Sequence, residues 1–165
     1  MIDARESDNG PIAGRLRQLL LLILALGMIG TAADLVLLQH YEDAWQAPPL
    51  VLIGSALVVL AILWIRSSWV MVTIMRVIMA LFITSGAAGV LLHYNSNSEF
   101  QRELDPTLSG WPLAVKVLSA KAPPALAPGV MVQLGLIGLL FTYRHPSLVH
   151  PSRQRMLEHS SGAQK

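Results

Sequence analysis

Residues 18–39 read QLLLLILALGMIGTAADLVLLQ, an apolar run whose only ionisable residue is Asp34. A helix needs about 20 apolar residues to cross the roughly 30 Å of hydrocarbon in a bilayer. The run therefore predicts a membrane-spanning helix. Three further runs have the same character, at 49–65, 70–92 and 124–143. Together they predict an all-α integral membrane protein, a four-helix transmembrane bundle occupying residues 15–144.

The composition agrees with a membrane protein. Apolar residues make up 53% of the 165-residue chain and charged residues 13%, about half the charged share of a soluble domain. The chain has no cysteine, which excludes disulfides, thiolate catalysis, iron–sulfur ligation and cysteine-type zinc sites. The sequence is basic, with a pI near 9.3. Its basic residues are dispersed around the hydrophobic runs, so we expect no nucleic-acid partner.

The basic residues predict the direction of the four spans, because cytoplasmic loops are enriched in Lys and Arg. Three of the twelve fall on the side of the membrane that carries the segments after the first and third spans, namely Arg102, Lys116 and Lys121. The other nine fall on the opposite side: Arg5, Arg15, Arg17, Arg66, Arg76, Arg144, Arg153, Arg155 and Lys165. We therefore expect both termini in the cytoplasm, with the bacterial inner (plasma) membrane as the location.

The first run admits one alternative. Arg15 and Arg17, the apolar stretch after them, and "TAA" before Asp34 are also typical of a signal peptide with a cleavage site. Cleavage would leave three spans. An uncleaved signal-anchor fits the charge bias and the four-span count better.

Two short motifs suggest an internal repeat. "LLQHYEDAWQ" at 37–46 and "LLHYNSNSEF" at 91–100 both place His-Tyr at the end of an apolar run, and "APPL" at 47–50 and "APPAL" at 122–126 both precede the next run. Proline suits a helix start, where its missing N–H would be unpaired anyway. The pattern predicts two tandem helical hairpins related by an axis along the membrane normal. That axis would give His40 and His93 equivalent outer positions.

The remaining segments lie outside the spans. Residues 95–123 predict a short extracytoplasmic helical cap, with a helix begun by Ser98, a turn at "DPTLSG" and an amphipathic helix from Trp111 that lies over the end of the bundle. Residues 1–14 and 145–165 are polar, with Pro, Gly and Ser. We expect both tails to be largely disordered in the cytoplasm.

Polar and small residues inside the spans give two readings. One polar side chain per span falls at similar depth, which would make an intramembrane polar layer of Asp34, Ser55, Ser85 and Gln133 if all faced inward. A carboxylate at membrane depth is costly and hence a candidate functional residue. The alternative is ordinary helix packing, in which small residues permit close approach. The candidates for packing are Gly27, Gly30, Gly86, Gly89, Gly135 and Gly138.

The outer ends of the first and third spans carry the candidate ligands. Imidazole with nearby carboxylates suits a divalent metal, which gives His40, Glu42, His93 and Glu99 as a candidate set. His40 and His93 on facing helices could instead ligate a b-type haem. Neither a His-Glu-x-x-His nor a Glu-x-x-His pattern is present. We therefore expect no cofactor, with haem b or a divalent metal as the alternatives.

The sequence holds no nucleophile elbow, P-loop, Rossmann fingerprint or metalloprotease motif, so we expect no enzyme. A small polytopic protein of this kind predicts an accessory or assembly subunit that packs against other membrane subunits, or against itself, within the lipid bilayer. Two alternatives remain. One is a redox or metal-binding protein that uses His40 and His93, and the other is a channel or transporter component with Asp34 in its path.

Overall fold

The computed structural model describes residues 3–39, 41–42, 46–120 and 126–148, with side chains described from Ile12 onward. Within these ranges the protein is all-helical and contains no strand. Three of its helices are long and apolar enough to cross a membrane by length and composition. These findings agree with the all-α membrane class predicted from the sequence.

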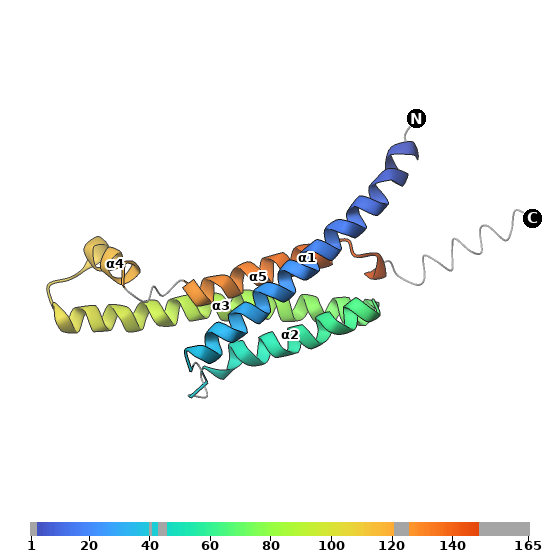
Figure 1. Cartoon of the computed structure of the whole chain (residues 1–165). Helices are drawn as coiled ribbons and strands as arrows, with labels where there is room; N and C mark the ends of the chain where they lie inside the picture. The colour runs from blue at the N-terminus through green and yellow to red at the C-terminus, as the bar shows by residue number, and fades with distance from the viewer. Residues whose placement is uncertain (1–2, 40, 43–45, 121–125, 149–165) are drawn as a thin grey trace, which may run out of the picture.

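Four apolar helices pack around one core (Figure 1). They are α1 (Asp3–Leu37), α2 (Ala47–Ile65), α3 (Trp69–Leu104) and α5 (Leu126–Thr142). Contacts join α1 to α2, α2 to α3, α3 to α5 and α5 back to α1, which places α1 and α3 on one diagonal. The spans Ile12–Leu37, Ala47–Ile65 and Trp69–Leu104 have membrane length, whereas α5 has 17 residues and is a shorter apolar helix.

Local sequence explains the ends of α2 and α3. Two prolines open α2 directly after Ala47, as the Ala-Pro-Pro motif predicted. The second such motif, at 122–126, falls largely outside the described residues. Only three residues separate α2 from α3, and the last of them, Ser68, caps α3 by accepting a hydrogen bond from the Met71 N–H (3.3 Å). Because of this short turn, the end of α2 and the start of α3 lie side by side, and the two helices run antiparallel.

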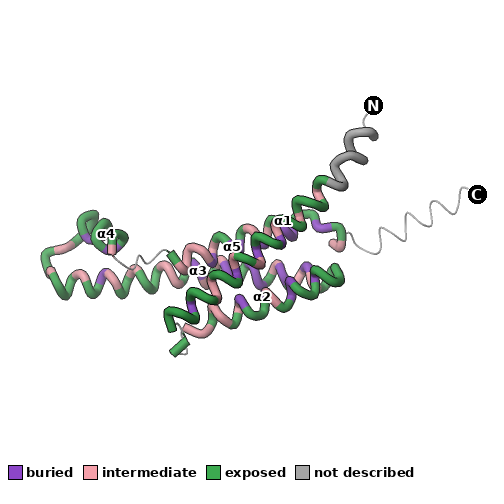
Figure 2. Tube along the Cα trace, in the orientation of Figure 1, coloured by how far each residue is buried: buried purple, intermediate pink, exposed green. Residues whose placement is uncertain are grey.

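The core fills the space where the four helices meet (Figure 2). Its largest fully buried side chains are apolar and come from three helices: Leu24, Met28, Ile53, Val72, Met75, Met79 and Phe82. Phe82 and Met79 of α3 lie at its centre. Met131, Leu134 and Phe141 of α5 complete it. The core is therefore narrow, and many other apolar side chains face outward, as expected for helices surrounded by lipid.

The closest helix–helix approach is between α3 and α5. A Cβ added to Gly86 would lie 2.6 Å from the Pro128 carbonyl oxygen and 3.0 Å from the Val132 nitrogen. A Cβ added to Gly135 would lie 2.8 Å from the Met79 carbonyl oxygen. Because these neighbours are backbone atoms, they cannot rotate away as a side chain could. The two backbones therefore meet at distances that only glycine permits.

The third predicted span is longer than expected. We expected it to end at Leu92 and a separate helix to begin at Ser98, but α3 continues without a break to Leu104. Its 36 residues span about 54 Å, more than the roughly 30 Å of hydrocarbon. Ser98 is buried on this helix and caps nothing. The predicted end at Leu92 rested on the polarity of the residues that follow it. Polar residues that are compatible with a helix do not end one.

The predicted lid is instead a stalk, which we define as residues 93–104 of α3 together with α4 (Gly110–Leu118). Leu113 and Val117 of α4 are buried against α3, and among the described residues α4 contacts no other helix. Figure 1 shows the stalk projecting away from the bundle. The turn predicted at 105–110 is present. The Thr107 hydroxyl and N–H both donate to Asp105 (2.6 and 3.1 Å), and these bonds hold the pKa of Asp105 below its usual range.

The predicted tails also differ from the structure. Residues 3–14, expected to be disordered, continue α1 toward the N-terminus. His145, expected in a polar tail, is buried and packs against the Phe141 ring with centroids 5.6 Å apart. A short 3-10 helix, Pro146–Leu148, follows it. Residues 149–165 of the predicted tail lie outside the described residues.

Arginines tie the C-terminal end of α5 to its neighbours. The last carbonyls of a helix have no partner within the helix. Arg76 of α3 donates to the carbonyl oxygen (2.8 Å) and hydroxyl (3.3 Å) of Thr142, which is fully buried. Arg17 of α1 donates to the Arg144 carbonyl oxygen (3.0 Å). Positive charge at a helix C-terminus is also favoured by the helix dipole. Arg76 is therefore a half-buried link between helices.

A pair of glycine substitutions tests the close approach. Gly86→Ala places a methyl group against the α5 backbone, whereas Gly30→Ala meets nothing within 4 Å. Both changes gain the same helix propensity. We therefore expect Gly86→Ala to be less stable than Gly30→Ala by about 1–3 kcal/mol, the usual cost of overpacking, measured by unfolding in mixed micelles. Equal stabilities for the two variants would contradict this packing.

Candidate functional site

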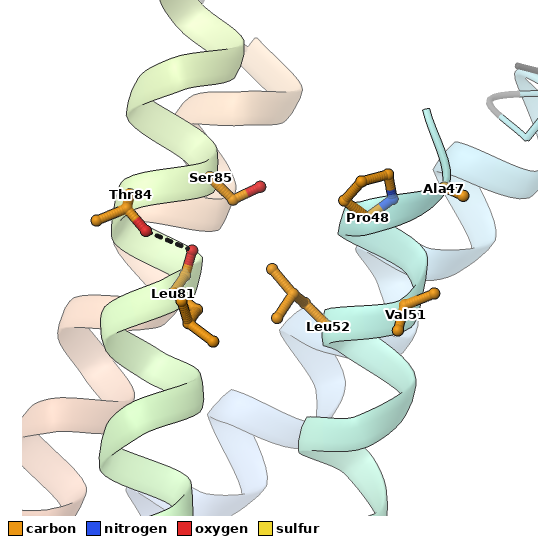
Figure 3. Close-up of a pocket in the computed structure, with 7 residues that line it drawn as sticks. All are labelled: Ala47, Pro48, Val51, Leu52, Leu81, Thr84 and Ser85. Atoms are coloured by element: carbon orange, nitrogen blue, oxygen red, sulfur yellow. Dashed lines mark hydrogen bonds between the residues drawn. The ribbon is translucent and has the colours of Figure 1, made fainter. Parts of the chain in front are cut away.

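One open site is a groove between α2 and α3. It is lined by Ala47, Pro48, Val51 and Leu52 of α2 and by Leu81, Thr84 and Ser85 of α3, and it has a volume of about 630 Å³. Figure 3 shows Ser85 of α3 pointing toward α2 and Leu52 of α2 pointing toward α3 across a gap. We call this site the α2–α3 groove.

The groove results from how the two helices are connected. The three-residue turn at 66–68 holds α2 and α3 together at one end. Away from the turn the two helices diverge, and α2 leans toward the end of α1 (Figure 1). Small side chains stand at the open end, where Ala47 and Pro48 face Thr84 and Ser85. They leave a space that larger residues would have filled.

The chemistry of the groove is apolar with two hydroxyl groups. The Thr84 hydroxyl bonds to carbonyl oxygens of its own helix, Ala80 (3.3 Å) and Leu81 (3.1 Å). Ser85 is half-buried, and among the described residues no hydrogen bond joins its hydroxyl to the opposite wall. Small and hydroxyl residues at an apolar surface are the composition of transmembrane helix interfaces. The groove therefore has the shape and chemistry of an unfilled helix-packing surface.

The predicted polar layer does not form inside this chain. Asp34, Ser55 and Gln133 are exposed, and only Ser85 is half-buried. The Ser55 hydroxyl bonds to the Leu52 carbonyl oxygen of its own helix (2.8 Å). Asp34 lies one turn before the end of α1 at Leu37, so its carboxylate is close to the end of the helix.

Only part of the candidate metal set lies in the described residues, and that part forms no cluster. His40 lies outside the described residues, and Glu42 is exposed in the turn after α1. His93 and Glu99 are both exposed on α3, six residues or about 9 Å of helix rise apart. No group of three or more His, Asp or Glu side chains that could share a metal exists in the described part of the chain. The metal and haem readings remain predictions that rest on His40.

The two His-Tyr motifs also have different surroundings. Tyr41 follows the end of α1, whereas His93 and Tyr94 lie within α3, and His93 is eleven residues before its end.

Most of the candidate packing glycines lie where an added Cβ would press on a neighbouring helix, namely Gly27, Gly86, Gly89, Gly135 and Gly138. Gly30 faces open space.

Sequence reasoning identified Ser85 but missed the other groove residues. Ala47, Leu81 and Leu52 are of the same types that face lipid or the core elsewhere, so composition carries no signal for them. The adjacent hydroxyls of Thr84 and Ser85 were the one available signal. It points to a groove only when the opposite wall on α2 is known.

A search of protein-family models, curated protein sequences and solved structures found no match to this chain. Its function is therefore inferred from geometry and chemistry.

The openness of the groove can be measured on a chain that has no native cysteine. A nitroxide attached to Ser85→Cys in the purified protein should be accessible to oxygen nearly as much as one at the exposed Val58 of α2. A nitroxide at Ile78, which is buried on α3, gives the shielded reference. Power-saturation EPR in bilayers measures all three. A Ser85 label as shielded as the Ile78 label would show that the groove is closed.

Proposed function

We propose that this protein is an accessory or assembly subunit of a larger membrane complex, and that the α2–α3 groove receives a transmembrane helix of the partner. The groove carries this proposal. It lies between two helices of membrane length, is walled mainly by small and apolar residues, and stays open beside the packed core of the bundle. Close packing and hydroxyl contacts drive helix association in lipid, where burial from water contributes little.

The same proposal includes the full membrane topology. We propose α5 as the fourth span and two tandem hairpins, α1–α2 and α3–α5. The ring order of contacts among the four helices supports this pairing. The clustering of Arg15, Arg17, Arg66, Arg76 and Arg144 at one end supports a cytoplasmic location for that end. The bacterial inner membrane is the location that fits these features.

The stalk gives the partner a second surface outside the membrane. At about 1.5 Å per residue, residues 93–104 of α3 extend about 18 Å beyond the His93 level. Apolar side chains remain exposed on the stalk, and Trp111 is 78% exposed. The others are Phe100, Leu104, Val115 and Leu118. A partner that fills the groove would reach this surface from the same direction along α3.

Blocking the groove tests the proposed function. Ser85→Trp fills the groove from its α3 wall, and Leu136→Trp adds the same bulk at an exposed position of α5 that does not line it. We expect Ser85→Trp to lose the membrane proteins that co-purify stoichiometrically with the affinity-tagged wild type in mild detergent. Leu136→Trp should retain them. Mass spectrometry of the purified complexes measures both.

Two results would contradict the proposal. One is a wild-type protein that purifies from its native membrane without any stoichiometric partner and with the mass of a monomer. The other is a complex that survives Ser85→Trp unchanged. Far-UV circular dichroism and the unfolding midpoint of each variant show whether the fold itself has been preserved.

A further inference from the structure

A second pocket lies at the arginine-rich end of the bundle, away from the α2–α3 groove. It has a volume of about 360 Å³ and is formed where α1, α2 and the end of α5 meet. Its polar lining is Arg17, Gln18, Ser67 and His145, and its apolar lining is Leu21, Leu63, Trp64 and Phe141. We call it the basic pocket.

The chain is bent in an uncommon way to form this pocket. Arg144 has a φ of +46°, a left-handed conformation that residues other than glycine rarely adopt. The bend turns His145 back into the bundle, where it is buried. It also aims the Arg144 carbonyl oxygen at the Arg17 guanidinium. The strained residue thus places a histidine and an arginine around one space.

The hydrogen bonds of His145 fix what it offers to a ligand. Its Nδ1 accepts a hydrogen bond from the Ser147 N–H (3.3 Å), so in the neutral ring the proton is on Nε2 and can be donated. Burial, then the charges of Arg17 and Arg76, hold the pKa of His145 below 6.5. The ring is therefore a neutral donor in a positively charged site. The Ser67 hydroxyl is already donated to the Leu63 carbonyl oxygen (3.2 Å).

The positive charge around the pocket has no nearby described counter-charge. One N–H group of Arg17 donates to a carbonyl oxygen, and two N–H groups of Arg76 donate to Thr142. The carboxylates with described side chains lie on the far end of α1, in the turn after it, or on the stalk: Asp34, Glu42, Glu99, Glu103 and Asp105. Asp3, Glu6 and Asp8 precede Arg17 by at least nine residues, about 13 Å of helix. The pocket is thus suited to an anion.

We infer that the basic pocket binds a phosphate group, with Arg17, Gln18 and His145 as its hydrogen-bond donors. Guanidinium groups bind phosphate oxygens through charge-assisted hydrogen bonds. The apolar wall of Leu63, Trp64 and Phe141 fits the acyl chains of a lipid whose headgroup carries the phosphate, as in an anionic phospholipid at the end of the bundle. Basic pockets between transmembrane helices bind lipid headgroups in this way.

Binding should be visible at His145 itself. An anion beside the ring offsets the two guanidinium charges, so the pKa of His145 should rise when the pocket is filled. Linkage then requires tighter binding at lower pH, as the protonated ring is favoured in the complex. The readout is the ¹⁵N NMR titration of His145 in ¹⁵N-histidine-labelled protein, with its signal identified by its loss in His145→Gln.

The experiment compares the full chain in nanodiscs of phosphatidylcholine alone with nanodiscs containing phosphatidylglycerol, and adds inorganic phosphate to the former. We expect phosphatidylglycerol to raise the pKa of His145 and inorganic phosphate to leave it unchanged, which identifies a lipid headgroup. A rise with both probes would identify a soluble phosphate compound as the source of the same chemistry. No rise with either probe would overturn the inference.

Matched variants separate a site from general charge. Arg17→Gln should weaken phosphatidylglycerol binding about tenfold or more, since a charged hydrogen-bond partner is lost. Arg66→Gln removes the same charge at an exposed position outside the pocket and should have little effect. An equal loss in both variants would overturn the inference. If Arg17→Gln fails to fold, Gln18→Leu removes a donor at an exposed position of the same pocket and should weaken binding.

Discussion

The close contact between the backbones of α3 and α5 is the constraint on which the rest of this structure depends. Gly86 and Gly135 allow it, because a Cβ at either position would meet backbone atoms of the other helix. In lipid, where burying apolar surface contributes little to helix association, such contacts supply van der Waals attraction. The pair positions Phe82 and Met79 at the centre of the core, and α1 and α2 pack around it.

The two candidate sites follow from that arrangement at opposite ends. Within the described bundle, α5 and α2 each contact α3 but not each other. The short turn between α2 and α3 brings these two helices together at one end only. The open end becomes the α2–α3 groove. At the end where the short turn joins α2 and α3, Arg76 and Arg17 donate hydrogen bonds to carbonyl oxygens at and just beyond the end of α5. The residues after α5 place His145 in the basic pocket. The close packing of α3 against α5 therefore determines where the α2–α3 groove and the basic pocket lie.

The sequence predicted the class of protein and the approximate position of each apolar helix, because a membrane imposes length and apolarity on individual segments. It did not predict where helices end. Residues 93–104 are mostly polar yet continue α3, since the segment contains no Pro or Gly to end the helix. It also did not predict burial. A polar layer required Asp34 and Gln133 to face inward, and both are exposed, because the packing of neighbouring helices decides which side of each helix is covered.

The central claim is that α3 and α5 meet through glycines, and solid-state NMR in lipid bilayers tests it most directly. A Cβ at Gly89 would lie 3.0 Å from the Pro128 Cβ, so the Gly89 Cα and the Pro128 ring are close in space. Protein labelled with ¹³C at glycine and proline should show short-range cross-peaks between Pro128 and both Gly86 and Gly89. Well-resolved helical glycine and proline signals without these cross-peaks would contradict the account.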